Sequence, residues 1–83
     1  MATIRMYFAP WCHDCRAAKR FLDERGVAYE AVDIEQIPAA ADLIIEKNDC
    51  KRTVPTFEVN GRWFAVSPFD PDLLAAQLGL DSA

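Results

Sequence analysis

Several features that define large protein classes are scarce or missing in this sequence. It has no apolar run long enough to span a membrane and no segment typical of a secretory signal peptide, and it contains only three cysteines. An odd cysteine count cannot form the fully paired disulfide framework that small secreted domains use. We therefore expect a protein of a reducing compartment, the cytoplasm, with no membrane partner.

Positive charge is also scarce. Nine Lys and Arg residues stand against thirteen Asp and Glu residues, and the net charge is −4. Binding to nucleic acid or to an anionic membrane surface needs a basic patch, so neither partner is expected. The apolar fraction of 52% is enough for a hydrophobic core. Because no linker, repeat or low-complexity segment interrupts the chain, residues 1–83 are predicted to form one small domain, which we expect to be a monomer.

Hydrophobic periodicity divides the chain into seven short elements. Alternation predicts strands, apolar residues three and four apart predict helices, and Gly, Pro, Asn and Asp mark the ends. The Asn60-Gly61 pair predicts a two-residue hairpin turn, and Asp70-Pro71 predicts a helix start. The predicted elements are a strand over 3–8, a helix over 13–25, a strand over 27–34, a helix over 38–48, strands over 56–59 and 62–66, and a helix over 71–78.

The order of these elements is β-α-β-α-β-β-α. A strand–helix–strand unit that is complete within about 35 residues favours a parallel pair with a right-handed crossover. The later hairpin adds two strands, and the last strand is antiparallel. Together the elements predict a compact α/β fold in which a four-stranded mixed sheet is flanked by three helices.

Residues 9–16 (Ala-Pro-Trp-Cys-His-Asp-Cys-Arg) join the first strand to the first helix. Cys12 falls near the unsatisfied N–H groups and the positive end of the helix dipole, which favour a thiolate. Cys15 follows one turn later on the same face, close enough to form a disulfide without movement of the backbone. Two cysteines in this context are a redox signature. We therefore predict thiol–disulfide exchange, with Cys12 as the nucleophile and Cys15 as the resolving thiol.

Residues beside the pair are candidates for tuning it. His13 as an imidazolium favours a thiolate and Asp14 as a carboxylate disfavours it, so the sign of their net effect stays open. Asp14 also suits the first turn of a helix. Trp11 is predicted to form an apolar wall beside the disulfide. Arg16 is a candidate for binding an acidic partner or the carboxylate of a small thiol, with a solvated surface cation as the alternative.

With this motif in this position, the chain resembles the glutaredoxin family, which has the thioredoxin fold, over nearly its whole length. The matching parts are the opening strand, the 9–15 segment, Lys19 and the sequence Thr53-Val54-Pro55-Thr56, which matches the family's Thr-Val-Pro turn. The resemblance implies a glutaredoxin-type fold and a dithiol thiol–disulfide oxidoreductase. It also implies a cis Val54–Pro55 peptide bond, and a place for Thr53, Val54 and Pro55 beside the cysteine pair as substrate- or thiol-binding residues.

One segment departs from the glutaredoxins that use glutathione. Those proteins carry two glycines and then an acidic pair after the last strand, where this chain has Ala65 and Val66. Side chains there are expected to crowd the γ-glutamyl end of glutathione. Residues 67–72 instead resemble the Ser-Gly-Phe-x-Pro-acid segment of NrdH-type redoxins, with a small offset and with proline in place of glycine. This likeness makes Ser67 and Phe69 candidate contacts for a substrate or partner.

The resemblance also implies the electron partners. NrdH-type redoxins are recharged by thioredoxin reductase and feed electrons to ribonucleotide reductase, whereas the related mycoredoxins serve a low-molecular-weight thiol. We expect this chain to reduce protein disulfides or mixed disulfides with no bound cofactor. Its electrons would come ultimately from NADPH, through a reductase or a low-molecular-weight thiol.

Two other classes of function stay open on the sequence. In one, Cys12 and Cys15 bind a metal or an iron–sulfur cluster, together with Cys50 or across two chains. Two thiolates alone are fewer than the four ligands of a structural zinc site. In the other, the chain is a non-catalytic adaptor whose fold has kept its cysteines. Cys50 itself is expected to be a free thiol, with a regulatory or cluster-binding role as the alternative.

Overall fold

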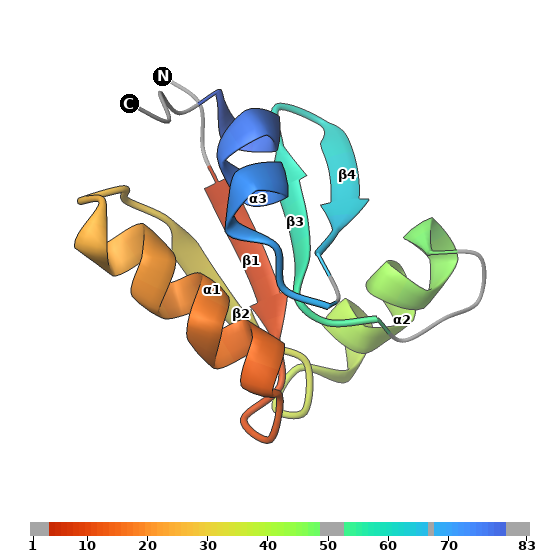
Figure 1. The fold of residues 1–83 in the computed structure, drawn as a ribbon. Coiled ribbons are helices and arrows are strands. Elements are labelled where there is room, and N and C mark those ends of the chain that lie inside the picture. Colours follow the sequence, from red (N-terminus) through yellow and green to blue (C-terminus); the bar gives the residue numbers. More distant parts are fainter. Residues whose placement is uncertain (1–3, 49–52, 67, 80–83) are drawn as a thin grey trace.

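The computed structural model describes residues 4–48, 53–66 and 68–79 (Figure 1). They form seven elements in the predicted order: β1 (Ile4–Phe8), α1 (His13–Glu24), β2 (Glu30–Asp33), α2 (Pro38–Lys47), β3 (Thr56–Val59), β4 (Arg62–Ala65) and α3 (Pro71–Leu78). No helix within these ranges is long and apolar enough to cross a membrane. The type and order of the elements were therefore predicted correctly, and the errors concern their ends.

The four strands form one mixed sheet in the order β2-β1-β3-β4. β1 and β2 are parallel, as the strand–helix–strand unit predicted. β3 is antiparallel to β1, and β4 is antiparallel to β3. β1 is therefore a central strand, and its last residue, Phe8, leads directly into the cysteine segment.

The helices cover both faces of the sheet, and the side chains of β1 alternate between these faces. Met6 is fully buried in a cluster that contains Leu22 of α1 and Leu74 of α3. Tyr7 belongs to a second cluster, with Ile44 of α2. Figure 1 shows α1 (orange) and α3 (blue) in front of the sheet. The second cluster also contains both cysteines of the motif, so the redox pair is part of the packed core.

The second strand is shorter than predicted. The sequence placed its start at Val27, but β2 begins at Glu30. Gly26 has a φ of 67°, and its N–H donates to the carbonyl of Asp23, while the N–H of Val27 donates to that of Leu22. These bonds form a Schellman motif, which closes α1. Because residues 26 and 27 complete the helix end, they are not available to pair with β1.

The remaining ends agree closely with the sequence. Asn60 and Gly61 both have positive φ (52° and 81°), as the two-residue hairpin turn requires. The carboxylate of Asp70 accepts two backbone N–H groups of the first turn of α3, which confirms it as the N-cap. α1, β2, α2 and β4 each end one residue before the predicted position, a difference within the usual scatter of element boundaries.

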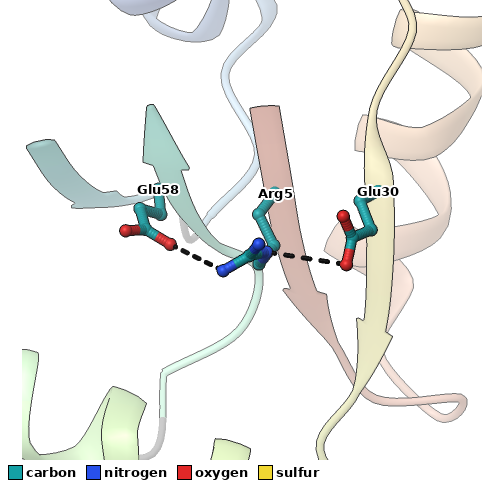
Figure 2. A network of polar contacts seen from close by, with 3 residues as sticks. All are labelled: Arg5, Glu30 and Glu58. Atoms are coloured by element: carbon teal, nitrogen blue, oxygen red, sulfur yellow. Dashed lines mark hydrogen bonds and ion pairs between the residues drawn. The ribbon is translucent and has the colours of Figure 1, made fainter. Parts of the chain in front are cut away.

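A row of charged side chains crosses three strands of the sheet (Figure 2). Arg5 of β1 donates from Nη1 to Oε1 of Glu58 in β3 at 3.3 Å, and its Nε lies 3.7 Å from Oε1 of Glu30 in β2. Both acids are the direct cross-strand partners of Arg5. A hydrogen bond with the side chain of Tyr7, and then the charge of Glu30, raise the pKa of Arg5 above its ordinary value.

Candidate functional site

The cysteine pair lies at the junction of β1 and α1, as predicted. Cys12 is the N-cap of α1, and its Sγ accepts a hydrogen bond from the N–H of Cys15 at 3.1 Å. The N–H of Cys12 donates to the carbonyl of Ala9 at 3.1 Å, which fixes the turn before the helix. Cys12 and Cys15 are both free cysteines. An N–H group of the first helical turn thus points at the sulfur of Cys12, the arrangement that stabilises negative charge at a helix start.

The Val54–Pro55 turn lies against this pair. Its peptide bond is cis, which confirms what the family resemblance implied. The Sγ of Cys12 donates to the carbonyl of Val54 at 3.6 Å, across 42 residues of sequence. Val54 and Pro55 are buried, and Thr53 before them is half-buried. The turn therefore forms one wall of the site and holds a carbonyl against the predicted nucleophile.

A buried threonine supports this turn, and sequence reasoning did not single it out. Thr56 is fully buried; its Oγ1 donates to the carbonyl of Thr53 at 2.6 Å and accepts from Nδ2 of Asn48 at 3.0 Å. These bonds join the end of α2 to both ends of the Thr53–Thr56 turn. A threonine at the first position of the strand, directly after a proline, was the available signal.

Both cysteines of the motif are buried. The exposed fraction is 6% for Cys12 and 3% for Cys15, so Cys12 is the more exposed of the two by a small margin. Burial is the largest cause that raises the pKa of Cys15 far above its ordinary value, and a hydrogen bond between its side chain and that of Cys12 comes next. The charge of Asp14 acts in the same direction. This environment favours the thiol form of Cys15 over the thiolate.

Trp11 projects from the loop before Cys12, and 59% of it is exposed. Its indole N–H donates to Oε2 of Glu35 at 2.7 Å. Glu35 lies in the turn between β2 and α2, where its backbone N–H donates to Oδ1 of Asp33 at 2.8 Å. Trp11 thus presents apolar surface next to Cys12 in a fixed position. No sequence pattern pointed to Glu35, because the contact depends on how β2 and the cysteine loop lie in space.

Asp14 occupies the first turn of α1, as predicted, and has a further role. Its Oδ1 accepts the backbone N–H of Phe69 at 3.0 Å. The ring of Phe69 packs edge-on against Phe21 of α1, with ring centroids 6.1 Å apart. Asp14 therefore ties the cysteine helix to the segment before α3. The structure places Phe69 beside the helix that carries the motif, where the sequence made it a candidate contact.

The other polar candidates on α1 lie at the surface. His13 is exposed, and so is Arg16, whose Nη2 donates to the carbonyl of Pro10 at 3.4 Å. Nζ of Lys19 lies 5.9 Å from the centre of the Phe8 ring. Among the described residues, Arg16 and Lys19 thus contact the cysteine loop and the end of β1, and neither forms an ion pair with a carboxylate.

Two candidates from the sequence, Ser67 and Cys50, lie outside the described residues. Of the two positions that replace the glycine pair, Val66 is fully buried in the cluster under α1 and α3, and its N–H donates to the carbonyl of Pro55 at 3.1 Å. Ala65 in β4 is half-buried. The expectation that both side chains crowd a ligand is therefore wrong for Val66, because its side chain fills the core.

The described residues offer thiol chemistry rather than a set of metal ligands. Within 4–48, 53–66 and 68–79, no three His, Cys, Asp or Glu side chains gather closely enough to hold a metal ion. The site instead combines two cysteines one helical turn apart, a backbone N–H directed at the first sulfur and a buried turn against it. This arrangement suits reversible formation of a disulfide between neighbouring thiols.

Comparisons with known proteins agree with this geometry. A family model described as Glutaredoxin matches residues 4–64 of the chain. Two curated proteins from two strains of Mycobacterium tuberculosis, both named as glutaredoxins, are 40% identical over 55 residues. Each alignment covers 66% of this chain and 66% of the relative, which is just under two thirds of either protein.

Solved structures show the same fold. A mutant of the thioredoxin-like protein BC3987 is similar with a TM-score of 0.80 and 29% identity, over 94% of this chain and 96% of that one. The glutaredoxin-like NrdH-redoxin from Escherichia coli is similar with a TM-score of 0.76 and 24% identity, over 89% of this chain and 92% of that one. The thioredoxin-like arrangement of a four-stranded mixed sheet and three helices is thus shared by both.

Proposed function

Since this chain belongs to the glutaredoxin family, we propose that it is a dithiol oxidoreductase with Cys12 as the nucleophile and Cys15 as the resolving thiol. Family and fold support thiol–disulfide oxidoreductase chemistry in general. The observation that supports the two roles is the hydrogen bond from the N–H of Cys15 to the sulfur of Cys12 at 3.1 Å. Negative charge is stabilised at that end of the helix, whereas burial keeps Cys15 a thiol.

The proposed reaction consists of two exchanges. The thiolate of Cys12 attacks one sulfur of a substrate disulfide, forms a mixed disulfide and expels the other substrate sulfur as a thiolate, which takes up a proton. Cys15 then gives up its proton and attacks the sulfur of Cys12. The second substrate thiol leaves, a Cys12–Cys15 disulfide forms, and two electrons have passed to the substrate.

The surroundings of Cys15 suit this order of events. Two of the contributions that raise the pKa of Cys15 come from Cys12, through its hydrogen bond and its charge. A mixed disulfide on Cys12 carries no charge, so its formation removes the electrostatic contribution. Deprotonation of Cys15 thus becomes easier at the step that requires it.

Serine variants test the two roles. Cys15→Ser should form a stable mixed disulfide on Cys12 but lose turnover on a protein disulfide such as insulin, because resolution needs the second thiol. Cys12→Ser should lose both. Mass spectrometry after limiting iodoacetamide should find the label on Cys12 of the parent first. Insulin reduction by Cys15→Ser at the parent rate, or preferential labelling of Cys15 or Cys50, would contradict the assignment.

We also propose that thioredoxin reductase recharges the protein faster than glutathione does. Behind Ala65 and Val66 there is no adjacent acidic pair to hold a γ-glutamyl ammonium, and residues 67–72 resemble NrdH-type redoxins. The E. coli NrdH-redoxin is itself described as having a thioredoxin-like activity profile. Ribonucleotide reductase is accordingly the proposed acceptor, with other protein disulfides and mixed disulfides as alternatives. The proposed cycle needs no cofactor bound to this chain.

An assay with matched electron supply tests the reductant. The oxidised protein is given NADPH with thioredoxin reductase, or NADPH with glutathione reductase and glutathione, and NADPH consumption is compared. A third arm with mycothiol and its reductase tests the mycoredoxin-like route. Efficient turnover through either small thiol, with no signal through thioredoxin reductase, would overturn this proposal and leave the dithiol chemistry intact.

A further inference from the structure

A cavity of about 190 Å³ opens beside Cys15, between β1 and α1. Its floor is apolar and comes from Met6, Phe8 and Ala9, while α1 supplies the thiol of Cys15 and two cations, Arg16 and Lys19. The exchange reaction described above uses the sulfur of Cys15 but leaves the rest of this space without a role. This lining therefore suits an occupant that has both an apolar part and a charged part.

The cations lie on the same face of α1 as the nucleophile. Cys12, Cys15, Arg16 and Lys19 follow the i, i+3, i+4, i+7 spacing of one helix face. At 1.5 Å per residue, Arg16 and Lys19 lie about 6 and about 10 Å along the helix from Cys12. An extended polypeptide covers that distance in about two to three residues.

The charge of these cations is not neutralised by the described part of the chain. The ion pairs formed by residues 4–48, 53–66 and 68–79 involve Arg5 and not Arg16 or Lys19. Arg16 instead contacts the carbonyl of Pro10, and Lys19 lies over an aromatic ring. Asp14 faces the other side of the helix, toward Phe69. Two neighbouring cations over an apolar floor fit a carboxylate on a short apolar stem.

We propose that this cavity binds an acidic side chain of a polypeptide substrate, two or three residues from the cysteine that Cys12 attacks. This inference rests on the exchange reaction proposed above. The volume favours a single side chain, because small-molecule sites usually measure about 300–1,000 Å³. Trp11 also favours a polypeptide, because its exposed ring extends the apolar surface beyond the nucleophile, and such aromatic residues are enriched in protein interfaces.

Matched peptide disulfides test the proposal. Each pair differs only in Glu or Gln at the second or third residue from the cysteine, on either side, and kcat/KM is measured with the reduced protein. The Glu peptide should be preferred about five- to tenfold, mainly through a lower KM. The preference should shrink as salt is raised, because exposed charges are screened.

Variants connect the preference to the cavity. The double variant Arg16→Gln, Lys19→Gln should bring the kcat/KM values of the two peptides within about twofold of each other. Arg20→Gln is the matched control, because Arg20 is an exposed cation of the same helix that does not line the cavity. It should keep the preference. If Arg20→Gln abolishes the preference as fully as the double variant does, the effect is one of overall charge and the inference is wrong.

Further outcomes separate this inference from the function on which it rests. If the parent reduces Glu and Gln peptides equally well, the inference fails and the proposed function stands; if it reduces neither, both fail. The disulfide of mercaptopropionic acid and the uncharged hydroxyethyl disulfide provide a small-molecule pair. If the kcat/KM values for these two disulfides lie within about twofold of each other, the result supports a polypeptide occupant. A preference as large as that for the peptides, and lost in the double variant, would assign the cavity to small acids instead and overturn the proposal.

Discussion

Replacement of Thr56 by valine is expected to destabilise the reduced protein by about 1–3 kcal/mol, because it removes two hydrogen bonds from a buried position. The hydroxyl of Thr56 donates to the carbonyl of Thr53 at 2.6 Å and accepts from the amide of Asn48 at 3.0 Å. Valine has nearly the same shape but leaves both partners unpaired. For a domain of this size the loss corresponds to a fall of roughly 4–24 °C in Tm.

The same substitution should slow the chemistry. The turn that Thr56 holds carries the Val54 carbonyl, which lies 3.6 Å from the sulfur of Cys12. Loss of the Thr53 contact frees one end of the turn, so alkylation of Cys12 by iodoacetamide should change in rate and insulin reduction should fall. Thr56→Ser is the control: it keeps the hydroxyl, loses one methyl group at about 1 kcal/mol, and should retain the parent kinetics.

Urea unfolding of the reduced protein, followed by far-UV circular dichroism, measures the stability difference. A cycle with Asn48→Ala then isolates the bond between the two side chains, for which a coupling energy of about 0.5–1.5 kcal/mol is expected. The reasoning is refuted if Thr56→Val loses less than about 0.5 kcal/mol and also keeps the parent rate of Cys12 alkylation.

Three further predictions follow from other contacts. Because the pKa of Cys15 is higher in the folded state, the unfolded chain releases the thiol proton of Cys15 first as pH rises, and stability should fall above about pH 8.5. Urea midpoints measured at rising pH should show this fall, and the fall should be weaker in Cys15→Ser. Asp14→Ala should speed hydrogen exchange of the Phe69 amide, because it removes the acceptor of that N–H. Asp14→Asn keeps an acceptor and should leave this exchange slow, but it removes the charge that raises the pKa of Cys15, so Cys15 alkylation should become faster. Arg5→Gln should lower the urea midpoint at low salt, with a smaller loss at about 1 M salt, where the screening length is about 3 Å; an equal loss at both salt concentrations would argue against an electrostatic origin.

Local signals explain what could be predicted from the sequence. The cysteine pair falls between an alternating run and a helical run, and the Asn60-Gly61 turn depends only on neighbouring residues, so both were found. The start of β2 was missed because Gly26 and Val27 form backbone bonds that close α1, and apolar periodicity does not report such bonds.

Contacts between distant parts of the chain account for the rest of the site. Glu35 meets Trp11 across 24 residues, and Phe69 meets Asp14 across 55. Both pairings depend on the placement of loops around the sheet, which no pattern in a single sequence specifies. The cis peptide at Pro55 was implied by the family motif and not by the residues themselves, since cis is the minority form at proline.

The charged row across the sheet has a consequence for the spacing of the redox site. Arg5 stands directly opposite Glu30 on one side and Glu58 on the other, so a slip by one residue in either pairing would set it against Ala31 or Phe57, or another uncharged neighbour. Such a slip displaces one strand by about 3.3 Å. β1 carries the loop of Cys12, and β3 follows directly on the turn that contains Val54. A shift of that size would break the contact of 3.6 Å between the sulfur and the carbonyl. One arginine at the far end of β1 thus helps to set the alignment that brings nucleophile and turn together.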